Sequence, residues 1–345
     1  MRKIGIIGHF GGNEEFFDGQ TVKTKILNDE LLATGNFETY KVDTYYVRKN
    51  PVKVFFQTVK SMLTCDSVIV IVAQNGIKVF APFLYFLNKI TKTPVYHDAL
   101  GADLVDFTRE NKGMVKYVNS FGANWVELQN MCDQLAENGV NNAVLLPNIK
   151  RLKAVEGFNE NSFGKKPFKF CTFSRVIREK GITDAINTIH KINKNFGEIV
   201  SKLDIYGPVA DEYKEEFAEL ENNFGEAISY KGIVDFDKSV QTLKEYDALL
   251  FPTLYEHEGF PGTMIDAFYS AVPVIATNKS SNGDIVTDGI TGIIYPNDKF
   301  NDLYDAIKWC IENGDEVIKM KKNALEESEK YDADTLMKLI IDAIS

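Results

Sequence analysis

Two basic residues, Arg175 and Lys180, lie between an apolar run and an amphipathic stretch. A guanidinium binds phosphate oxygens as a planar fork, and an ammonium neutralises them as a point charge. Together the two side chains suit a diphosphate, which has two negative centres to neutralise. Two exposed basic residues in an ordinary loop would produce the same pattern, so both interpretations stay open for the pair taken alone.

A second segment places two carboxylates, Glu258 and Asp266, on either side of an expected helix N-terminus. Pro261 favours the first turn of a helix, because its fixed φ and missing amide suit that position. The leading amides, from Phe260 to Thr263, would then form a cradle for an anion. The carboxylates would face the same crevice and accept hydrogen bonds from sugar hydroxyls. In the alternative interpretation, Glu258 only caps the helix and Asp266 is solvated.

Two weaker candidates lie in the first half of the chain. A loop with Gly11 and Gly12 follows the first apolar run and leads through Gly19 and Gln20 into an amphipathic stretch. Glycines let a backbone approach a ligand, and a helix N-terminus favours an anion, although glycines also occur there for steric reasons alone. His97 ends another apolar run, where it would contact a polar ligand across an interdomain cleft or serve as a structural histidine.

Elements that could position these residues follow from the alternation of apolar runs with amphipathic stretches. Runs rich in Ile, Val and Leu are typical of strands buried on both faces, as in parallel sheets. Their alternation with helices predicts doubly wound α/β units, in which ligands bind at the carboxyl ends of the strands. We predict strands at 3–8, 39–43, 67–72, 94–97, 124–127, 143–146, 168–173, 202–206, 228–231, 248–251, 272–276 and 292–295, and helices that include 21–33, 52–63, 79–90, 131–138 and 333–344.

These strands fall into two sets, which predicts two Rossmann-like domains. A length of 345 residues agrees with that number, at roughly 150 residues per domain. We expect the first domain at 1–148 and the second at 167–330, joined by a polar linker at 149–166. The terminal helix, at about 331–345, is expected to pack back on the first domain.

The loops taken together resemble the retaining glycosyltransferases of family 4, which have the GT-B fold. Residues 174–181 are similar to that family's GR…EKG segment, and 205–208 and 230–234 to its I-x-G-x-G and F-x-G-x-V segments. Residues 258–276 resemble its E-x7-E helix and the following G-x-P-V-I-A strand, and 288–292 are similar as well. The motifs occur in the family's order and spacing, and the resemblance spans nearly the whole chain.

The resemblance implies an α/β protein with two Rossmann-like domains whose mostly parallel sheets face each other across a cleft. It implies transfer of a sugar, with retention, from a nucleoside-diphosphate sugar in the second domain to an acceptor hydroxyl in the first. Catalytic roles fall to Arg175 and Lys180 at the diphosphate and to Glu258 and His97 at the sugar. Further donor contacts are expected at Gly207, Pro208, Gly259, Phe260, Pro261, Gly262, Thr263 and Asp266, and acceptor or phosphate contacts at Gly11, Gly12, Gly19 and Gln20.

Two residues depart from the family pattern. Asp266 stands where the family has its second glutamate and is one methylene shorter, so hydrogen bonds to the ribose would need a shifted helix or a water molecule. Pro208 replaces the last glycine of the G-x-G turn, which changes the loop expected near the nucleobase. Neither departure removes the cationic pair or Glu258.

Composition and cysteine spacing exclude several other classes of protein. Hydrophobic residues make up 44% and charged residues 26%, as in soluble globular proteins. The sequence opens directly on a strand pattern, so we expect no cleaved export signal and a cytoplasmic location. Four cysteines without a CxxC pair and four histidines without ligand spacing predict no zinc site. We expect no cofactor and no required metal, and we expect the D-x-D triplets 235–237 and 332–334 to begin or cap helices.

The charge distribution bears on partners. A net charge of −10 is a poor fit to nucleic acid, yet residues 44–92 contain seven cations and one anion, mixed with aromatic residues. Such a block suits an anionic membrane surface that carries a polyprenyl-linked saccharide, as in capsule or envelope polysaccharide synthesis, with the protein peripheral at the inner face of the cell membrane. Ordinary solvated lysines and a small soluble acceptor are the alternatives.

Three other functions compete with that of a glycosyltransferase. A dinucleotide-dependent oxidoreductase would need a G-x-G-x-x-G fingerprint, which the chain lacks. A phosphorylase or epimerase of similar two-domain shape remains a minor alternative. A catalytically silent nucleotide-sugar-binding module is disfavoured because Arg175, Lys180 and Glu258 are all present.

Overall fold

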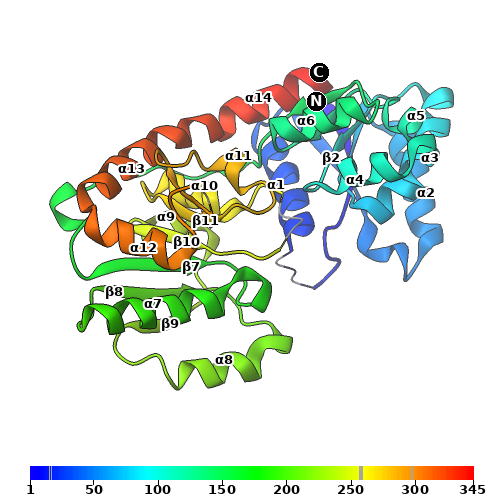
Figure 1. The fold of residues 1–345 in the computed structure, drawn as a ribbon. Coiled ribbons are helices and arrows are strands. Elements are labelled where there is room, and N and C mark those ends of the chain that lie inside the picture. The colour runs from blue at the N-terminus through cyan, green and yellow to red at the C-terminus, as the bar shows by residue number, and fades with distance from the viewer. Residues whose placement is uncertain (15, 17, 256–258, 297) are drawn as a thin grey trace. The chain divides into compact units, whose positions relative to one another are not determined.

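Two parallel sheets organise the part of the chain that the structure describes, which is 1–14, 16, 18–255, 259–296 and 298–345 (Figure 1). The structure is a computed structural model. It divides into unit 1, residues Met1–Lys150 with Asp332–Ser345, and unit 2, residues Arg151–Tyr331. Each unit contains one six-stranded sheet, so the predicted α/β class with two parallel sheets is confirmed.

In unit 1 the strand order is β2-β1-β3-β4-β5-β6, and every neighbouring pair is parallel. The strands are β1 (Arg2–Gly8), β2 (Phe37–Asp43), β3 (Ser67–Val70), β4 (Val95–Asp98), β5 (Asn124–Val126) and β6 (Ala143–Leu145). The helices are α1 (Gly19–Ala33), η1 (Thr44–Val47), α2 (Pro51–Thr64), α3 (Gln74–Thr91), α4 (Asp103–Glu110), η2 (Lys112–Met114), α5 (Val115–Val118), α6 (Gln129–Glu137) and α14 (Ala333–Ile344).

In unit 2 the strand order is β12-β11-β10-β7-β8-β9, again with parallel pairs throughout. The strands are β7 (Phe168–Phe173), β8 (Ser201–Tyr206), β9 (Ile228–Gly232), β10 (Ala248–Phe251), β11 (Val274–Thr277) and β12 (Gly292–Tyr295). The helices are η3 (Glu160–Ser162), η4 (Arg178–Lys180), α7 (Ile182–Phe196), η5 (Asp211–Tyr213), α8 (Lys214–Glu221), η6 (Phe236–Lys238), α9 (Ser239–Leu243), α10 (Gly262–Tyr269), α11 (Asn282–Ile285), α12 (Leu303–Glu312), α13 (Gly314–Glu327) and η7 (Ser328–Tyr331).

The core of unit 1 contains the terminal helix as well as the sheet. Ile4 and Ile6 of β1 and Trp125 of β5 lie in one buried cluster with four side chains of α14, namely Leu336, Met337, Ile340 and Ile344. On β1, Gly5 leaves room for α2, because a Cβ there would lie 2.0 Å from the hydroxyl oxygen of Ser61. Helix α14 therefore completes the fold of unit 1 from the far end of the chain.

Helix ends in both units follow simple local rules. The carboxylate of Asp18 accepts a hydrogen bond from the amide of Thr21 at 3.0 Å and so caps α1. Asn50 caps α2 in the same way, and Pro51 occupies its first turn. Asp332 accepts from the amide of Thr335 at 2.8 Å, which confirms the predicted cap of the terminal helix.

The division between the units lies at 150/151, and the segment predicted as a linker, 149–166, is mostly part of unit 2. The amide of Val155 donates to the carbonyl of Tyr269 at 2.9 Å, at the end of α10. The amide of Gly164 donates to the carboxylate of Asp247 at 2.8 Å. These contacts hold the polar segment against unit 2 although it contains little regular secondary structure.

Candidate functional site

Three loops converge at the carboxyl edge of the sheet in unit 2, where β10, β7 and β8 are neighbours. Gly207, after β8, has φ +129°, and a Cβ there would lie 1.8 Å from the carbonyl oxygen of Ser174, after β7. Gly181, before α7, has φ +69°, and its Cβ would lie 2.1 Å from the carbonyl oxygen of Pro252, after β10. Only glycine permits both approaches, so these two residues bring the loops together.

Backbone hydrogen bonds fix the loop that carries Arg175. The amide of Val176 donates to the carbonyl of Pro208 at 2.9 Å, and the amide of Ala210 donates to the carbonyl of Val176 at 3.2 Å. The hydroxyl of Tyr230 donates to the carbonyl of Gly207 at 2.8 Å. Pro208, predicted as a donor contact, therefore belongs to the turn that holds this loop in place.

The two predicted cations lie close enough to influence each other. Arg175 is exposed, and Lys180 is partly buried at the end of η4. Burial first, and the positive charge of Arg175 second, lower the pKa of Lys180 to about 8. The Lys180 Nζ lies 5.1 Å from the centre of the Phe251 ring. A bound anion would relieve the mutual repulsion of the pair, so the arrangement favours a negatively charged ligand.

A contact that the sequence did not indicate positions Lys180. The carbonyl of Glu179 accepts hydrogen bonds from the amide of Leu254 at 2.7 Å and from the hydroxyl of Thr253 at 3.2 Å. It thereby joins η4 to the loop after β10. No sequence signal points to this carbonyl, because backbone contacts between loops leave no trace in residue type.

The N-terminus of α10 lies in the segment predicted to cradle an anion. The helix begins at Gly262 with Pro261 as its cap residue, and proline has no side-chain acceptor for the leading amides. The Thr263 hydroxyl is buried and has no hydrogen-bond partner among the described residues. Phe260 is buried, and its ring centre lies 5.1 Å from that of Tyr331.

The residues of this segment differ in how far they are buried. Phe260 fixes the loop by packing, so any donor contact from this residue would come from its backbone. Gly259 is described and partly exposed, whereas Glu258 lies outside the described residues. The start of α10 presents the positive end of the helix dipole, which favours an anion there.

Asp266 is 3% exposed, and its Oδ1 accepts a hydrogen bond from the hydroxyl of Ser239 at 2.9 Å. The alternative of a solvated Asp266 is therefore wrong, because the carboxylate lies in the packed contact between α9 and α10. Its role at a nucleotide ribose stays a prediction.

His97 of β4 is 1% exposed, and its Nδ1 lies 3.1 Å from the Oδ1 of Asn124. Burial lowers the pKa of His97 to about 4, so the ring is neutral at pH 7. This environment matches the structural role left open by the sequence. A contact with the donor sugar stays a prediction.

The carboxylate of Asp43 holds the glycine loop after β1 in place. Asp43 accepts hydrogen bonds from the amides of Phe10 and Gly12 at 2.9 and 2.8 Å. Gly11 has φ +89°, and Gly19 opens α1. An anion bound to the Phe10 or Gly12 amide would have to displace the carboxylate of Asp43, which disfavours a phosphate at these two amides. A role of this loop in binding the acceptor stays a prediction.

The Gln20 side chain is also occupied. It donates to the carbonyl of Ile71 at 3.1 Å, just after β3. Gln20 therefore fixes the start of α1 against the sheet of unit 1, and a role at the acceptor stays a prediction for this residue too.

A buried ionic cluster at the carboxyl edge of unit 1 was missed by the sequence analysis. The Lys23 Nζ lies 2.7 Å from Asp98 Oδ1 and 3.0 Å from Glu127 Oε1. Burial opposes the charge of Lys23, but the two carboxylates outweigh it and raise the pKa of the lysine. Asp98 and Glu127 end neighbouring strand segments, and that shared position is the signal that could have revealed the pair.

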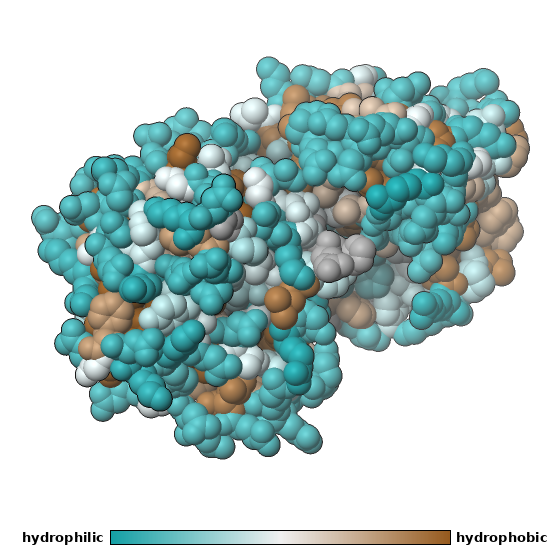
Figure 2. Space-filling model, viewed as in Figure 1, coloured by the Kyte–Doolittle hydropathy of each residue, from teal (hydrophilic) through white to brown (hydrophobic). Residues whose placement is uncertain are grey.

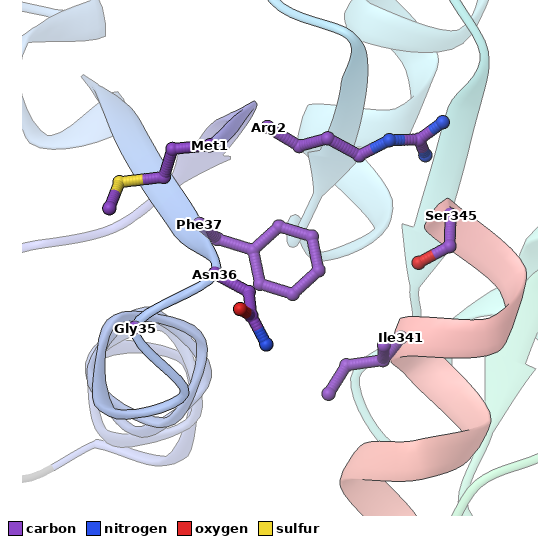
Figure 3. A pocket seen from close by; sticks show the side chains of 7 residues that line it. All are labelled: Met1, Arg2, Gly35, Asn36, Phe37, Ile341 and Ser345. Atoms are coloured by element: carbon purple, nitrogen blue, oxygen red, sulfur yellow. The ribbon is translucent and has the colours of Figure 1, made fainter.

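A cavity of about 480 Å³ lies elsewhere in unit 1, at the amino ends of β1 and β2 (Figure 3). Arg2, Phe37 and Ile341 line it, and the guanidinium of Arg2 donates to the carbonyl of Ile344 at 2.7 Å. Residues from both ends of the chain line this cavity, and none of the predicted site residues does. Ligands of parallel α/β sheets bind at the opposite, carboxyl edge.

Residues 156–327 match the family described as glycosyl transferases group 1. The matched range contains both cations, the converging loops and α10. The chain belongs to this family. The resemblance seen in the sequence motifs is thus confirmed at the level of the family and the GT-B fold.

Relatives of this group 1 glycosyl transferase include a protein of a cps region and a glycosyltransferase of capsular polysaccharide biosynthesis. It is 29% identical over 155 residues to an uncharacterised 41.2 kDa protein of the Klebsiella pneumoniae cps region, covering 45% of the chain and 40% of that protein. It is 26% identical over 131 residues to the capsular polysaccharide biosynthesis glycosyltransferase CapH of Staphylococcus aureus, covering 38% and 36%. The chain thus spans well under half of either relative.

Among solved structures, the group 1 glycosyl transferase is similar to Anabaena HepE in complex with UDP-glucose. The TM-score is 0.71 at 15% identity, over 100% of this chain and 99% of that one. This likeness shows the fold. In the described part of the chain, no helix combines the length and hydropathy needed to span a membrane.

Proposed function

We propose that this group 1 glycosyl transferase moves a sugar from a nucleoside-diphosphate sugar to an acceptor hydroxyl, with retention at the anomeric carbon. The observation that carries the proposal is the pair Arg175 and Lys180 at the carboxyl edge of unit 2, where burial and the charge of Arg175 lower the pKa of Lys180. Family membership supports the reaction class, and the cation pair supports a diphosphate leaving group.

The chemical step breaks the bond between the anomeric carbon and the diphosphate oxygen and forms a bond from that carbon to the acceptor oxygen. With attack on the leaving-group face, the acceptor proton passes to the departing phosphate. Negative charge grows on the bridging oxygen as it leaves. Arg175, Lys180 and the amides of Gly262 and Thr263 would stabilise that charge, which is the costly part of the reaction.

The remaining roles come from the family resemblance. In this scheme Glu258 would orient the donor sugar, His97 would contact the donor sugar, and Asp266 would bind the ribose. Gly207 and Pro208 would contact the donor near its nucleobase. No metal or cofactor is assigned a role in this scheme.

The similar proteins suggest which donor and which acceptor to test first. HepE was solved with UDP-glucose, so a uridine nucleotide is the donor we propose first. The relatives of a cps region and of capsular polysaccharide biosynthesis favour a saccharide acceptor of polysaccharide synthesis, linked to a polyprenyl lipid at the inner face of the cell membrane.

Titration calorimetry with UDP, GDP, ADP and NADH tests the donor site, followed by product analysis with the matching sugar nucleotides. We expect one nucleoside diphosphate to bind and NADH to give no heat. Slow hydrolysis of the matching donor without acceptor would exclude a catalytically silent binding module. Binding of NADH alone would contradict the proposal.

A further inference from the structure

The outward face of helix α2 is more apolar than the face that packs on the sheet. Its inward residues are small or mixed, namely Val54, Thr58, Ser61 and Met62. Its outward apolar residues recur at helical spacing, namely Val52, Phe55, Phe56 and Leu63, and they are 62%, 49%, 64% and 65% exposed. A helix of a soluble protein normally shows the opposite polarity, with charged residues outward.

Helix α3 also exposes apolar residues on its outward face. Val79, Phe86 and Ile90 are 64%, 56% and 78% exposed, and they follow one another at helical spacing. The inward face is separately filled by Ile77, Phe80, Ala81 and Leu84. The exposed apolar residues are thus in excess of those needed to hold the helix on the sheet.

The two outward faces join into one surface. The ring of Phe55 on α2 stacks on that of Phe83 on α3, with centres 5.0 Å apart. We define the α2–α3 face as Val52, Phe55, Phe56, Leu63, Val79, Phe83, Phe86 and Ile90. Hydrophobic side chains gather along the right margin of Figure 2, where Figure 1 places α2, α3 and α5. Contiguous apolar surface of this kind marks an interaction site.

Positive charge surrounds the α2–α3 face. Exposed lysines on the two helices include Lys53, Lys60, Lys78 and Lys89, whereas neither helix contains an acidic residue. The Lys53 Nζ lies 4.4 Å from the centre of the Tyr46 ring, and the Lys89 Nζ lies 4.3 Å from that of Tyr85. These cations contrast with the net charge of −10 of the whole chain.

We propose that the α2–α3 face docks on an anionic lipid surface, with its apolar side chains inserted among the acyl chains and its lysines paired with lipid phosphates. Amphipathic helices that lie in a membrane interface combine such an apolar face with flanking lysines. A second copy of the chain is a poorer occupant, because it would bring the same lysines against one another. This docking rests on the proposed function for its biological use, because it assumes a lipid-linked acceptor. The α2–α3 face belongs to unit 1, whereas the proposed donor site belongs to unit 2.

Co-sedimentation with vesicles of phosphatidylcholine alone and of phosphatidylcholine with phosphatidylglycerol tests the docking. We expect the full chain to bind the anionic vesicles and to bind them less as salt is raised. The variant Phe56→Ser/Phe86→Ser/Ile90→Ser should bind at least roughly tenfold more weakly, because three exposed apolar side chains no longer insert. The variant Lys53→Gln/Lys60→Gln/Lys89→Gln should lose the preference for anionic lipid.

Matched controls use exposed residues outside the face. The variant Ile233→Ser/Ile290→Ser/Leu339→Ser removes apolar side chains that are 64%, 50% and 48% exposed, and it should bind vesicles as the unmodified chain does. Lys319→Gln/Lys322→Gln/Lys330→Gln removes three cations of unit 2 and should leave lipid binding unchanged as well.

Three outcomes would overturn the docking. They are no binding of the unmodified chain to anionic vesicles, equal loss in face and control variants, and a dimer in sedimentation velocity that dissociates with Phe86→Ser. Nucleotide binding by the same variants, measured by calorimetry without lipid, should stay unchanged. Because that readout reports unit 2, a failure of the docking and a failure of the proposed glycosyl transfer can be told apart.

Discussion

Arg175 and Lys180 are important for the proposed diphosphate site because they place two cations at the same edge of the sheet. In water, two such side chains would keep apart and stay charged. In unit 2, burial first and the charge of Arg175 second lower the pKa of Lys180 to about 8. A diphosphate adds negative charge beside both cations and so favours the charged form of Lys180.

Replacing Arg175 by alanine should weaken nucleoside-diphosphate binding by roughly ten- to a hundredfold and lower kcat as well, because a charge-assisted hydrogen bond is lost at a group that becomes more negative during the reaction. Arg178→Ala is the matched control, since Arg178 pairs with Glu216 at the surface. Calorimetry and initial rates measure both variants. Equal losses in the two variants would count against the role of Arg175.

The lowered pKa of Lys180 predicts that the affinity for a nucleoside diphosphate depends on pH. This pKa is about 8, and a bound diphosphate favours the charged form, so binding takes up a proton above that pH. Affinity should be constant below about pH 7 and fall by up to about tenfold per pH unit above pH 8. Calorimetry across this range measures the effect, and Lys180→Arg should remove it. A flat profile for the unmodified chain would contradict the assignment.

Glu258 is expected to act on the sugar and not on the nucleotide. Glu258→Gln should lower turnover by about a hundredfold or more while nucleotide affinity stays nearly unchanged, since the amide keeps the shape but not the charge. Steady-state kinetics and calorimetry with the nucleotide alone separate the two effects. Unchanged turnover would refute the role.

At the scale of elements, the site depends on close contact between loops. The apolar runs predicted each strand found among the described residues, and the motifs predicted the loops around which the candidate site is built. The contacts between loops could not be predicted, because the carbonyl of Glu179 and the turn at Pro208 act through backbone atoms. The predicted strand at 272–276 begins only at Val274, since the amide of Val272 instead closes the end of α10 on Ala267.

Gly207→Ala tests this dependence on close contact. The Cβ would overlap the carbonyl oxygen of Ser174 at a positive φ, so we expect a loss of about 3 kcal/mol or more in the free energy of unfolding and weaker nucleotide binding. Gly197→Ala has a positive φ but no atom within 4 Å, and should lose only about 1 kcal/mol. Urea unfolding compares the two. Equal losses would mean that the loops are not in contact.

At the scale of the whole molecule, the chain crosses from unit 2 back to unit 1 for its last helix. An amphipathic tail was predictable from its periodicity, and so was its cap at Asp332. The ionic cluster of Lys23, Asp98 and Glu127 was not, because it joins a helix to two strands that are far apart in the sequence. The polar segment after Lys150 was predicted as a linker because its contacts with unit 2, such as the bonds from the amides of Val155 and Gly164, leave no hydrophobic period in the sequence.

Ile340→Ala tests the place of α14. The side chain is fully buried in the core of unit 1, so its loss should cost about 2–5 kcal/mol of stability in that unit. Leu339→Ala, at an exposed neighbour, should cost less than about 0.5 kcal/mol. Unfolding followed by Trp125 fluorescence in a Trp309→Phe background reports unit 1. Nucleotide binding should persist in both variants, and its loss in Ile340→Ala alone would contradict a donor site confined to unit 2.

A crystal structure of the full chain with bound UDP, or with whichever nucleoside diphosphate binds most tightly, tests the central claim most directly. The account predicts diphosphate oxygens about 2.7–2.9 Å from the nitrogens of Arg175 and Lys180, with the start of α10 facing the same group. A nucleotide bound at the glycine loop of unit 1, or a diphosphate that neither cation touches, would contradict it.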